Sequence, residues 1–145
     1  MSNRTKIMVK IFSRTIRVSA GLFIVLGIAF SRTLPEDGPS STAEGAYTEA
    51  QAKRGERVQR RVCVRCHIPA YYKGGLLDSW TGNTVGALNS QISNTMPEDR
   101  PSSLKPQQYA DLMAYILMLN GFPAGDTELP SEDAALARII IERKK

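Results

Sequence analysis

Cysteine and histidine are scarce in this chain, which has two cysteines and one histidine among its 145 residues. So few cysteines exclude a scaffold held together by several disulfides. Three sulfur and imidazole donors also fall short of the four ligands that close a structural zinc site. Persistent alternation of polar and apolar residues, which is typical of strands, is missing as well. These absences leave an all-α domain as the predicted fold class.

Acidic residues are missing from the first 31 residues, which carry five basic ones. The whole chain has a formal net charge of +5 and a sequence pI of about 9.4, values that would suit a nucleic-acid-binding protein. After residue 31, however, 14 basic residues face 14 acidic ones, so the rest of the chain has no formal net charge. The basicity belongs to the N-terminal segment, and we expect no nucleic-acid partner.

The N-terminal segment, residues 1–31, has the layout of a secretory signal peptide. A basic region precedes a largely apolar stretch of thirteen residues at positions 18–30, and Ala29 and Ser31 flank Phe30 as an imperfect small-residue cleavage site. A membrane span needs about 20 apolar residues, so this stretch is short for one. The segment predicts export to the bacterial periplasm. The alternative is an uncleaved N-terminal anchor, in which case the protein would be held at the membrane.

Three further regions are predicted after this leader. Residues 32–47 are rich in proline, glycine, serine and acidic residues, which predicts a flexible linker. Residues 48–125 contain the clear helical patterns and form the predicted domain. Residues 126–145 are expected to form a C-terminal extension that packs on this domain.

The helical patterns have recognisable ends. Thr48 is suited to cap a helix that runs toward Cys63, with Gln51 three residues after the cap as in a capping box. Residues 84–92 predict a short helix. The clearest pattern covers residues 106–121, with proline at its first helical position and glycine just past its end. Glycine, proline, serine and asparagine are frequent between these helices, which predicts long loops.

Both cysteines and the only histidine lie in one short motif, VCVRCHIP, at residues 62–69. A thiol redox pair of the C-x-x-C type usually stands in an α/β fold, and no strand is predicted here. A structural disulfide between Cys63 and Cys66 suits an exported protein, but it gives no reason for His67 at the next position. The remaining possibility is attachment of a c-type haem.

The C-x-x-C-H spacing favours covalent haem attachment in an exported chain. Two cysteines three residues apart lie on one side of a helical turn, so both sulfurs can reach the vinyl groups of one haem. The residue after them then directs its imidazole toward the iron. Cys63 and Cys66 are therefore the predicted attachment sites of one haem c, and His67 is a predicted axial ligand of its iron.

A six-coordinate haem iron needs a second axial ligand, and the chain has no second histidine to supply it. Methionine is the remaining soft donor. Met113 and Met118 lie in the predicted 106–121 helix, where core packing is the ordinary role of methionine. Met96 lies in a loop, and Pro97 after it favours an extended backbone. Met96 is the predicted sixth ligand.

With these motifs, residues 48–121 resemble the class I cytochromes c. The resemblance rests on a first helix leading to CVRCH, a TMP ligand loop, and a final helix with LMAY. It implies a cytochrome c-like fold, in which three to five helices and long loops wrap around one covalently attached haem. The ending YADLMAYILMLNGFPAGDTELP is similar to that of small periplasmic monohaem cytochromes, some of which serve quinoprotein dehydrogenases as electron acceptors or subunits.

The resemblance also implies particular contacts. Gly55 matches a glycine that lets the first and last helices approach closely, and Leu112 and Tyr115 match its partner positions. Gln59 departs from the pattern, because the family often has an aromatic residue there. Trp80 matches a loop tryptophan whose indole N–H reaches a haem propionate in many members. Packing of the loop is the other role open to Trp80.

A one-electron carrier, and not an enzyme, is the function that the resemblance implies. Redox proteins are the expected partners, with a quinoprotein dehydrogenase as donor and a terminal oxidase or another cytochrome as acceptor. Two alternatives remain: an electron-transfer subunit of a dehydrogenase or membrane complex, and a haem enzyme or ligand sensor with an open sixth position. A basic stretch would either steer an acidic partner or form an ordinary solvated helix face. Its members are Lys53, Arg54, Arg57, Arg60, Arg61, Arg65 and Lys73.

Overall fold

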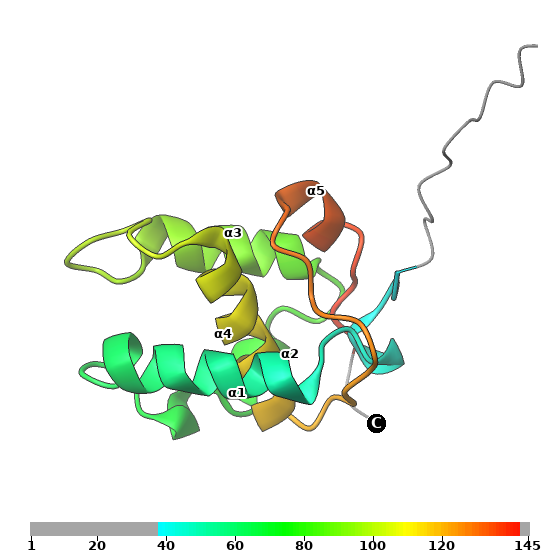
Figure 1. Cartoon of the computed structure of the whole chain (residues 1–145), viewed down its shortest axis with the longest axis horizontal. Helices are drawn as coiled ribbons and strands as arrows, with labels where there is room; N and C mark the ends of the chain where they lie inside the picture. Colours follow the sequence, from blue (N-terminus) through cyan, green and yellow to red (C-terminus); the bar gives the residue numbers. More distant parts are fainter. Residues whose placement is uncertain (1–37, 143–145) are drawn as a thin grey trace, which may run out of the picture. The chain divides into compact units, whose positions relative to one another are not determined.

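The computed structural model describes residues 38–142, and the predicted signal peptide lies outside them. The described part is helical (Figure 1). It contains no strands, only two isolated β-bridges, from Ile140 to Ser41 and to Thr84. The all-α prediction is confirmed. The elements are η1 (Thr42–Glu44), α1 (Glu49–Val58), η2 (Gln59–Cys63), η3 (Pro69–Tyr72), α2 (Gly75–Asp78), α3 (Val85–Thr95), α4 (Pro106–Leu119) and α5 (Asp133–Leu136).

The first helix begins where the capping residue predicts and leads directly to the haem motif. The Thr48 side chain accepts a hydrogen bond from the Gln51 N–H at 3.1 Å. After Val58 the chain continues without a break into η2, a π-helical turn that ends at Cys63. Such turns widen a helix locally and are frequent at functional sites. Here the turn sets the direction in which the first cysteine leaves the helix.

The first and last helices of the domain, α1 and α4, cross in direct contact (Figure 1). Gly55 lies at the crossing: a Cβ added there would overlap the carbonyl oxygen of Asp111 and lie 2.8 Å from the Cβ of Tyr115. The predicted role of Gly55 is therefore confirmed, with Tyr115 as one neighbour. The backbone of Asp111, and not Leu112, makes the nearest contact. Only glycine permits this distance between the two backbones.

Both ends of α4 follow the sequence signals, whereas α3 is longer than predicted. Pro106 is the first residue of α4, and Gly121 follows its end with a φ of 74°, a left-handed conformation that favours glycine. The Thr84 hydroxyl caps α3 by accepting the Ala87 N–H at 3.1 Å. The helix then continues to Thr95, three residues past the predicted end, and so brings Met96 to its C-terminus.

A partly buried arginine joins α1 to α4 and to the C-terminal extension. Arg54 donates to both carboxylate oxygens of Asp111, at 3.0 and 3.1 Å, and to both of Glu128, at 2.6 and 2.9 Å. The hydrogen bonds with Glu128 and then Asp111 raise the pKa of Arg54, so this group stays charged. The Asp111 side chain is only 7% exposed. Removing Arg54 would therefore leave a buried carboxylate without its cation, which is a costly arrangement.

The flexible linker predicted for residues 32–47 is wrong over its described part. Thr42, Ala46 and Tyr47 are buried, and the Tyr47 hydroxyl donates to the Phe122 carbonyl at 2.8 Å. Ile140 donates to the Ser40 carbonyl at 2.8 Å and accepts from the Thr42 N–H at 2.9 Å. These hydrogen bonds join distant parts of the sequence. Local composition carries no information about them, which is why the segment looked like a linker.

Residues 126–142 contribute to the same core. Leu129, Leu136, Ile139 and Ile141 are buried in it. The side chain of Gln51 in α1 accepts the Leu129 N–H at 2.7 Å and donates to the Leu129 carbonyl at 2.8 Å. Both polar groups of this buried amide are thus satisfied.

Among residues 38–142, none of the helices combines the length and apolarity that crossing a membrane requires.

We predict that Gly55→Ala destabilises the domain by about 3 kcal/mol, the upper end of ordinary overpacking costs, because the added methyl group meets backbone that cannot yield. Gly75→Ala is the matched control. Nothing lies within 4 Å of a Cβ at Gly75, and α2 contains it. We expect this control to be neutral or to stabilise by about 0.4–1 kcal/mol. Thermal unfolding of the purified variants measures both, and an unchanged melting temperature for Gly55→Ala would contradict the close crossing.

Candidate haem site

The C-x-x-C-H motif forms a tight turn at the end of η2. The N–H groups of Cys66 and His67 both donate to the Cys63 carbonyl, at 3.1 and 2.8 Å. The two cysteines are free thiols and are not bonded to each other. Cys63 is half-buried and Cys66 is exposed. A structural disulfide is therefore not part of this arrangement.

The Cys63 thiol lies in surroundings that do not suit a thiol redox pair. Burial raises the pKa of this thiol, and a hydrogen bond with the Tyr72 hydroxyl only partly opposes that effect. Burial likewise raises the pKa of Tyr72. Reactive cysteines of redox enzymes have a lowered pKa, because the thiolate is the nucleophile. A zinc site finds no support either: within the described range, His, Cys, Asp and Glu side chains form no group of three or more that could hold a metal ion.

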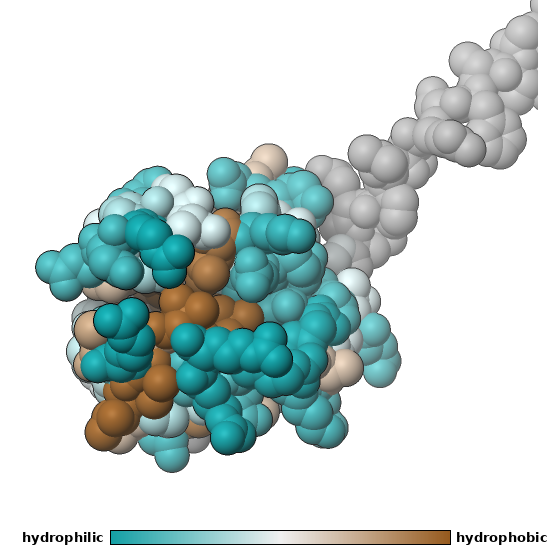
Figure 2. All heavy atoms as spheres, turned by 60° about the vertical axis from the view of Figure 1, so that its left-hand side comes forward, coloured by the Kyte–Doolittle hydropathy of each residue, from teal (hydrophilic) through white to brown (hydrophobic). Residues whose placement is uncertain are grey.

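One cavity of about 530 Å³ brings the predicted site residues together. This size is typical of cofactor pockets, which run from about 300 to 1,000 Å³. Figure 2 shows the face formed by the parts at the left of Figure 1, where hydrophobic side chains gather in a band between hydrophilic ones. The cavity is lined by Val62, Cys63, Arg65, Cys66, His67, Tyr71, Tyr72, Leu76, Trp80, Leu88, Gln91, Ile92, Thr95, Met96, Pro97, Glu98, Asp99, Leu104, Tyr109 and Leu112.

The three described methionines differ in position. Met96 lines the cavity together with His67, whereas neither Met113 nor Met118 does. Met113 is 1% exposed in the core, and Met118 is 38% exposed on the surface. Of these three, Met96 alone can place its sulfur in the same cavity as the imidazole.

The backbone at Met96 is held from two sides. Its N–H donates to the Ile92 carbonyl at 2.8 Å, which closes the end of α3. Its carbonyl accepts the Tyr109 hydroxyl at 2.8 Å. Tyr109 lies in the first turns of α4 and is 4% exposed. This hydrogen bond ties the methionine loop to α4. The sequence shows Tyr109 only as one apolar position of a helix face, so its second role was not predicted.

The aromatic residues of the site take different positions. Trp80 is half-buried and lines the cavity, which suits both roles open to it. Tyr71 is 55% exposed and stacks on the His67 ring, with centroids 4.4 Å apart and planes 28° apart. Tyr72 is buried and lies edge-on to His67, with the ring centroids 6.2 Å apart. The imidazole is thus flanked by two tyrosines on one short turn, η3.

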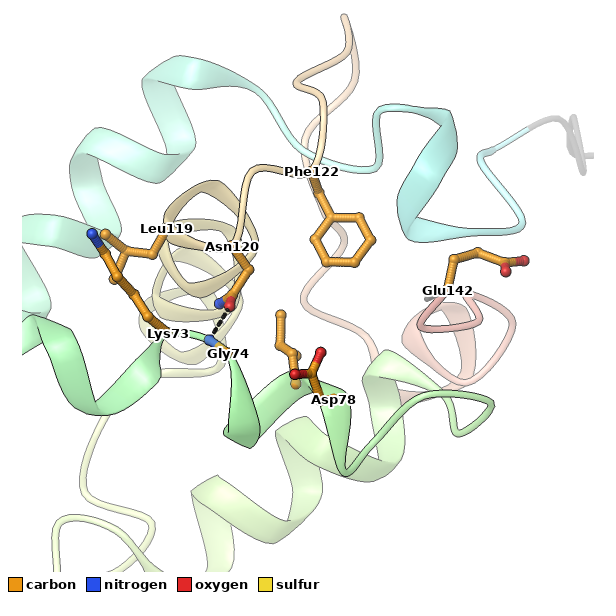
Figure 3. Close-up of a pocket in the computed structure, with 8 residues that line it drawn as sticks. Lys73, Gly74, Asp78, Leu119, Asn120, Phe122 and Glu142 are labelled. Atoms are coloured by element: carbon orange, nitrogen blue, oxygen red, sulfur yellow. Dashed lines mark hydrogen bonds between the residues drawn. The ribbon is translucent and has the colours of Figure 1, made fainter. Parts of the chain in front are cut away.

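An asparagine anchors the η3 turn to the end of α4. The Asn120 side chain accepts the Gly74 N–H at 2.7 Å (Figure 3) and donates to the Tyr72 carbonyl at 2.7 Å. It borders a second cavity of about 250 Å³, lined by Lys73, Gly74, Leu77, Asp78, Leu119, Asn120, Phe122 and Glu142. None of the predicted haem residues lines this second cavity. The second cavity is therefore separate from the predicted haem site.

The basic stretch between Lys53 and Lys73 does not form a uniform rim. Arg54 is held in its ion pairs with Asp111 and Glu128, away from the haem cavity. Arg65 lines the cavity, but so do Glu98 and Asp99. Side chains of both charge signs therefore line the cavity.

The residues present fit a haem. Two unbonded cysteines on one turn, an imidazole beside them and a thioether in the same largely apolar cavity are the donor set that such a group requires. The family model described as cytochrome c oxidase, cbb3-type, subunit III matches residues 50–116, from α1 through most of α4. Residues 50–116 are a class I cytochrome c domain. A comparison with curated proteins and one with solved structures each gave no match.

A cytochrome c domain carries a covalently attached haem c with its iron. Haem-based electron transfer is the activity of such domains, which work with redox protein partners. They are typically electron carriers and typically extracytoplasmic. The matched range contains the haem motif, Met96 and the helix crossing at Gly55.

We predict that haem in this cytochrome c domain is attached through Cys63 and Cys66. Acid–acetone extraction should leave the colour with the wild-type chain, because thioether bonds survive this treatment. Cys63→Ala combined with Cys66→Ala should lose all colour, whereas each single variant should keep one bond and retain colour. Release of haem from the wild-type chain would contradict this attachment.

Proposed function

We propose that the protein is a monohaem one-electron carrier whose iron is held by His67 and Met96. One observation carries the proposal: both side chains line one cavity, and the other two described methionines do not. When bound, the haem iron supplies reversible Fe(III)/Fe(II) cycling. A carrier of this kind needs no substrate at the iron, so both axial positions are filled by the chain itself.

The protein's own contribution is to keep this ligand set in place. Leu88, Ile92, Leu104 and Leu112 provide apolar walls that limit the access of water. Thioether ligation favours the ferrous state and raises the reduction potential above that of a bis-histidine site. The hydrogen bond from Tyr109 holds the Met96 backbone in place. Little rearrangement is then required when the electron arrives or leaves.

Two kinds of partner are consistent with this proposal. A quinoprotein dehydrogenase as donor, with a terminal oxidase or another cytochrome as acceptor, follows from the resemblance of the C-terminal sequence. The second candidate is an electron-transfer subunit of a larger complex, which the match to an oxidase subunit family favours. The two differ in whether the purified protein exchanges electrons as a free monomer or copurifies with other subunits.

We further propose that residues 1–31 direct export to the periplasm and are removed there. The proposal rests on the basic and apolar layout of these residues and on the usual extracytoplasmic place of such domains. N-terminal sequencing of the mature chain should give a start near Ser31. Recovery of the intact leader in the membrane fraction would favour the anchored form.

Met96→Ala tests the carrier assignment. The oxidised wild type should show the weak far-red absorption of a sulfur-to-ferric-iron bond. The variant should lose this band, have a lower reduction potential and bind carbon monoxide in its ferrous state, because a coordination position is opened. Met113→Leu, which conserves the volume of a core side chain, and Met118→Ala at the surface should both keep the band.

Fast binding of carbon monoxide by the unmodified ferrous protein would contradict the proposal. It would show an open sixth position, and the haem enzyme or ligand sensor would then be the better assignment.

A further inference from the structure

Gln59 has a fully buried side chain and stands shortly before the haem motif in the sequence. It is 0% exposed and lies where α1 passes into η2. Its Nε2 donates to the His67 carbonyl at 2.8 Å, while its Oε1 is buried without a hydrogen-bond partner. A buried carbonyl group without a hydrogen-bond partner lowers the stability of the fold. A hydrocarbon side chain of similar size would avoid this cost, so packing alone does not account for an amide at this position.

The one hydrogen bond that the Gln59 side chain makes is directed at His67. No backbone N–H of the described residues donates to the His67 carbonyl, so Gln59 supplies its donor. The His67 N–H is bonded to the Cys63 carbonyl at 2.8 Å. Both peptide groups of His67 are therefore fixed, one by the motif itself and one by Gln59.

The backbone of Gln59 supports the same turn. Its carbonyl accepts the Val64 N–H at 2.9 Å. A substitution of the side chain leaves this bond in place, so the effect of the amide can be separated from that of the π-helical turn. With the His67 backbone fixed, Tyr71 stacked at 4.4 Å restrains the remaining rotation of the imidazole.

We propose that Gln59 is a positioning residue that sets the plane of the His67 imidazole through the hydrogen bond to the His67 carbonyl. The proposal rests on the proposed function, because it takes His67 as an iron ligand. Without the amide, the His67–Ile68 peptide can rotate, and the imidazole plane turns with it.

Gln59→Leu tests this role. In ferric low-spin haem proteins, the paramagnetic proton shifts of the four haem methyl groups depend on the orientation of the axial imidazole plane. We expect the variant to keep its attached haem but to change the order or spread of these four resonances. Gln59→Met, with its flexible chain of similar length, carries the same expectation and serves if the leucine variant does not accumulate.

Gln51→Leu is the matched control. Gln51 lies on the same helix, is also 0% exposed and also bonds a backbone carbonyl, but its partner is Leu129. It should lower the melting temperature and leave the methyl pattern unchanged. A wild-type pattern in Gln59→Leu or Gln59→Met, with only a lower melting temperature, would overturn the proposal. The same change of pattern in Gln51→Leu would overturn it as well.

Measured on the cyanide adduct of the ferric protein, which is low-spin whether or not Met96 binds, the methyl pattern reports the imidazole plane independently of the sixth ligand. If the wild type lacks the far-red band but the Gln59 variants still change the methyl pattern, the carrier assignment fails and the role of Gln59 stands.

Discussion

The close approach of two helices at Gly55 is the constraint on which the site depends. α1 delivers the haem motif from its C-terminal end, and α4 carries Tyr109 and Leu112, which line the cavity opposite. If the helices were separated by the width of a methyl group, the distance between the His67 turn and the Met96 loop would change with them. The Arg54 ion pairs with Asp111 and Glu128 hold the same crossing from its edge. The relative positions of the two predicted ligands, His67 and Met96, therefore depend on a contact outside the cavity.

Around this crossing, the loops are held by a few side-chain hydrogen bonds to backbone. Tyr109 bonds the Met96 carbonyl, Asn120 bonds Gly74 and Tyr72, and Gln59 bonds the His67 carbonyl. Each of these side chains stands on or beside a helix and each partner stands in a loop or turn. Loops lack the regular backbone hydrogen bonds of helices, so side chains often satisfy their backbone groups. The helices thereby restrain the turns that carry the predicted ligands, which suits the proposed role in electron transfer.

Local signals in the sequence predicted the elements well. The Thr48 cap, Pro106 at the start of α4 and Gly121 past its end all lie where the sequence indicates. Gly55 could be placed at the crossing only through the resemblance, because a glycine in a helix does not indicate which other helix packs against it. Met96 was singled out by elimination, and its place in the cavity is consistent with that; ligation itself stays a prediction.

Contacts between distant parts of the chain could not be predicted from the sequence. The segment before Thr48 has the composition of a linker, yet Thr42 and Ser40 form backbone hydrogen bonds with Ile140. Arg54 looked like one member of a basic stretch, and only the fold brings Asp111 and Glu128 to it. Gln59 looked like a departure from a packing position. Its partner is the carbonyl of His67, the last residue of the C-x-x-C-H motif, and no residue pattern reveals this hydrogen bond.

The central claim is that His67 and Met96 are the two axial ligands of the haem iron. Nuclear magnetic resonance of the reduced protein tests it most directly. The methyl carbons of all methionines would be isotopically labelled in otherwise wild-type protein. A methionine methyl held against the face of a haem lies in the ring current and resonates far upfield of every ordinary methyl group. The account predicts one such resonance, absent in Met96→Leu and present in Met118→Ala. No upfield methyl resonance, or one that survives in Met96→Leu, would contradict it.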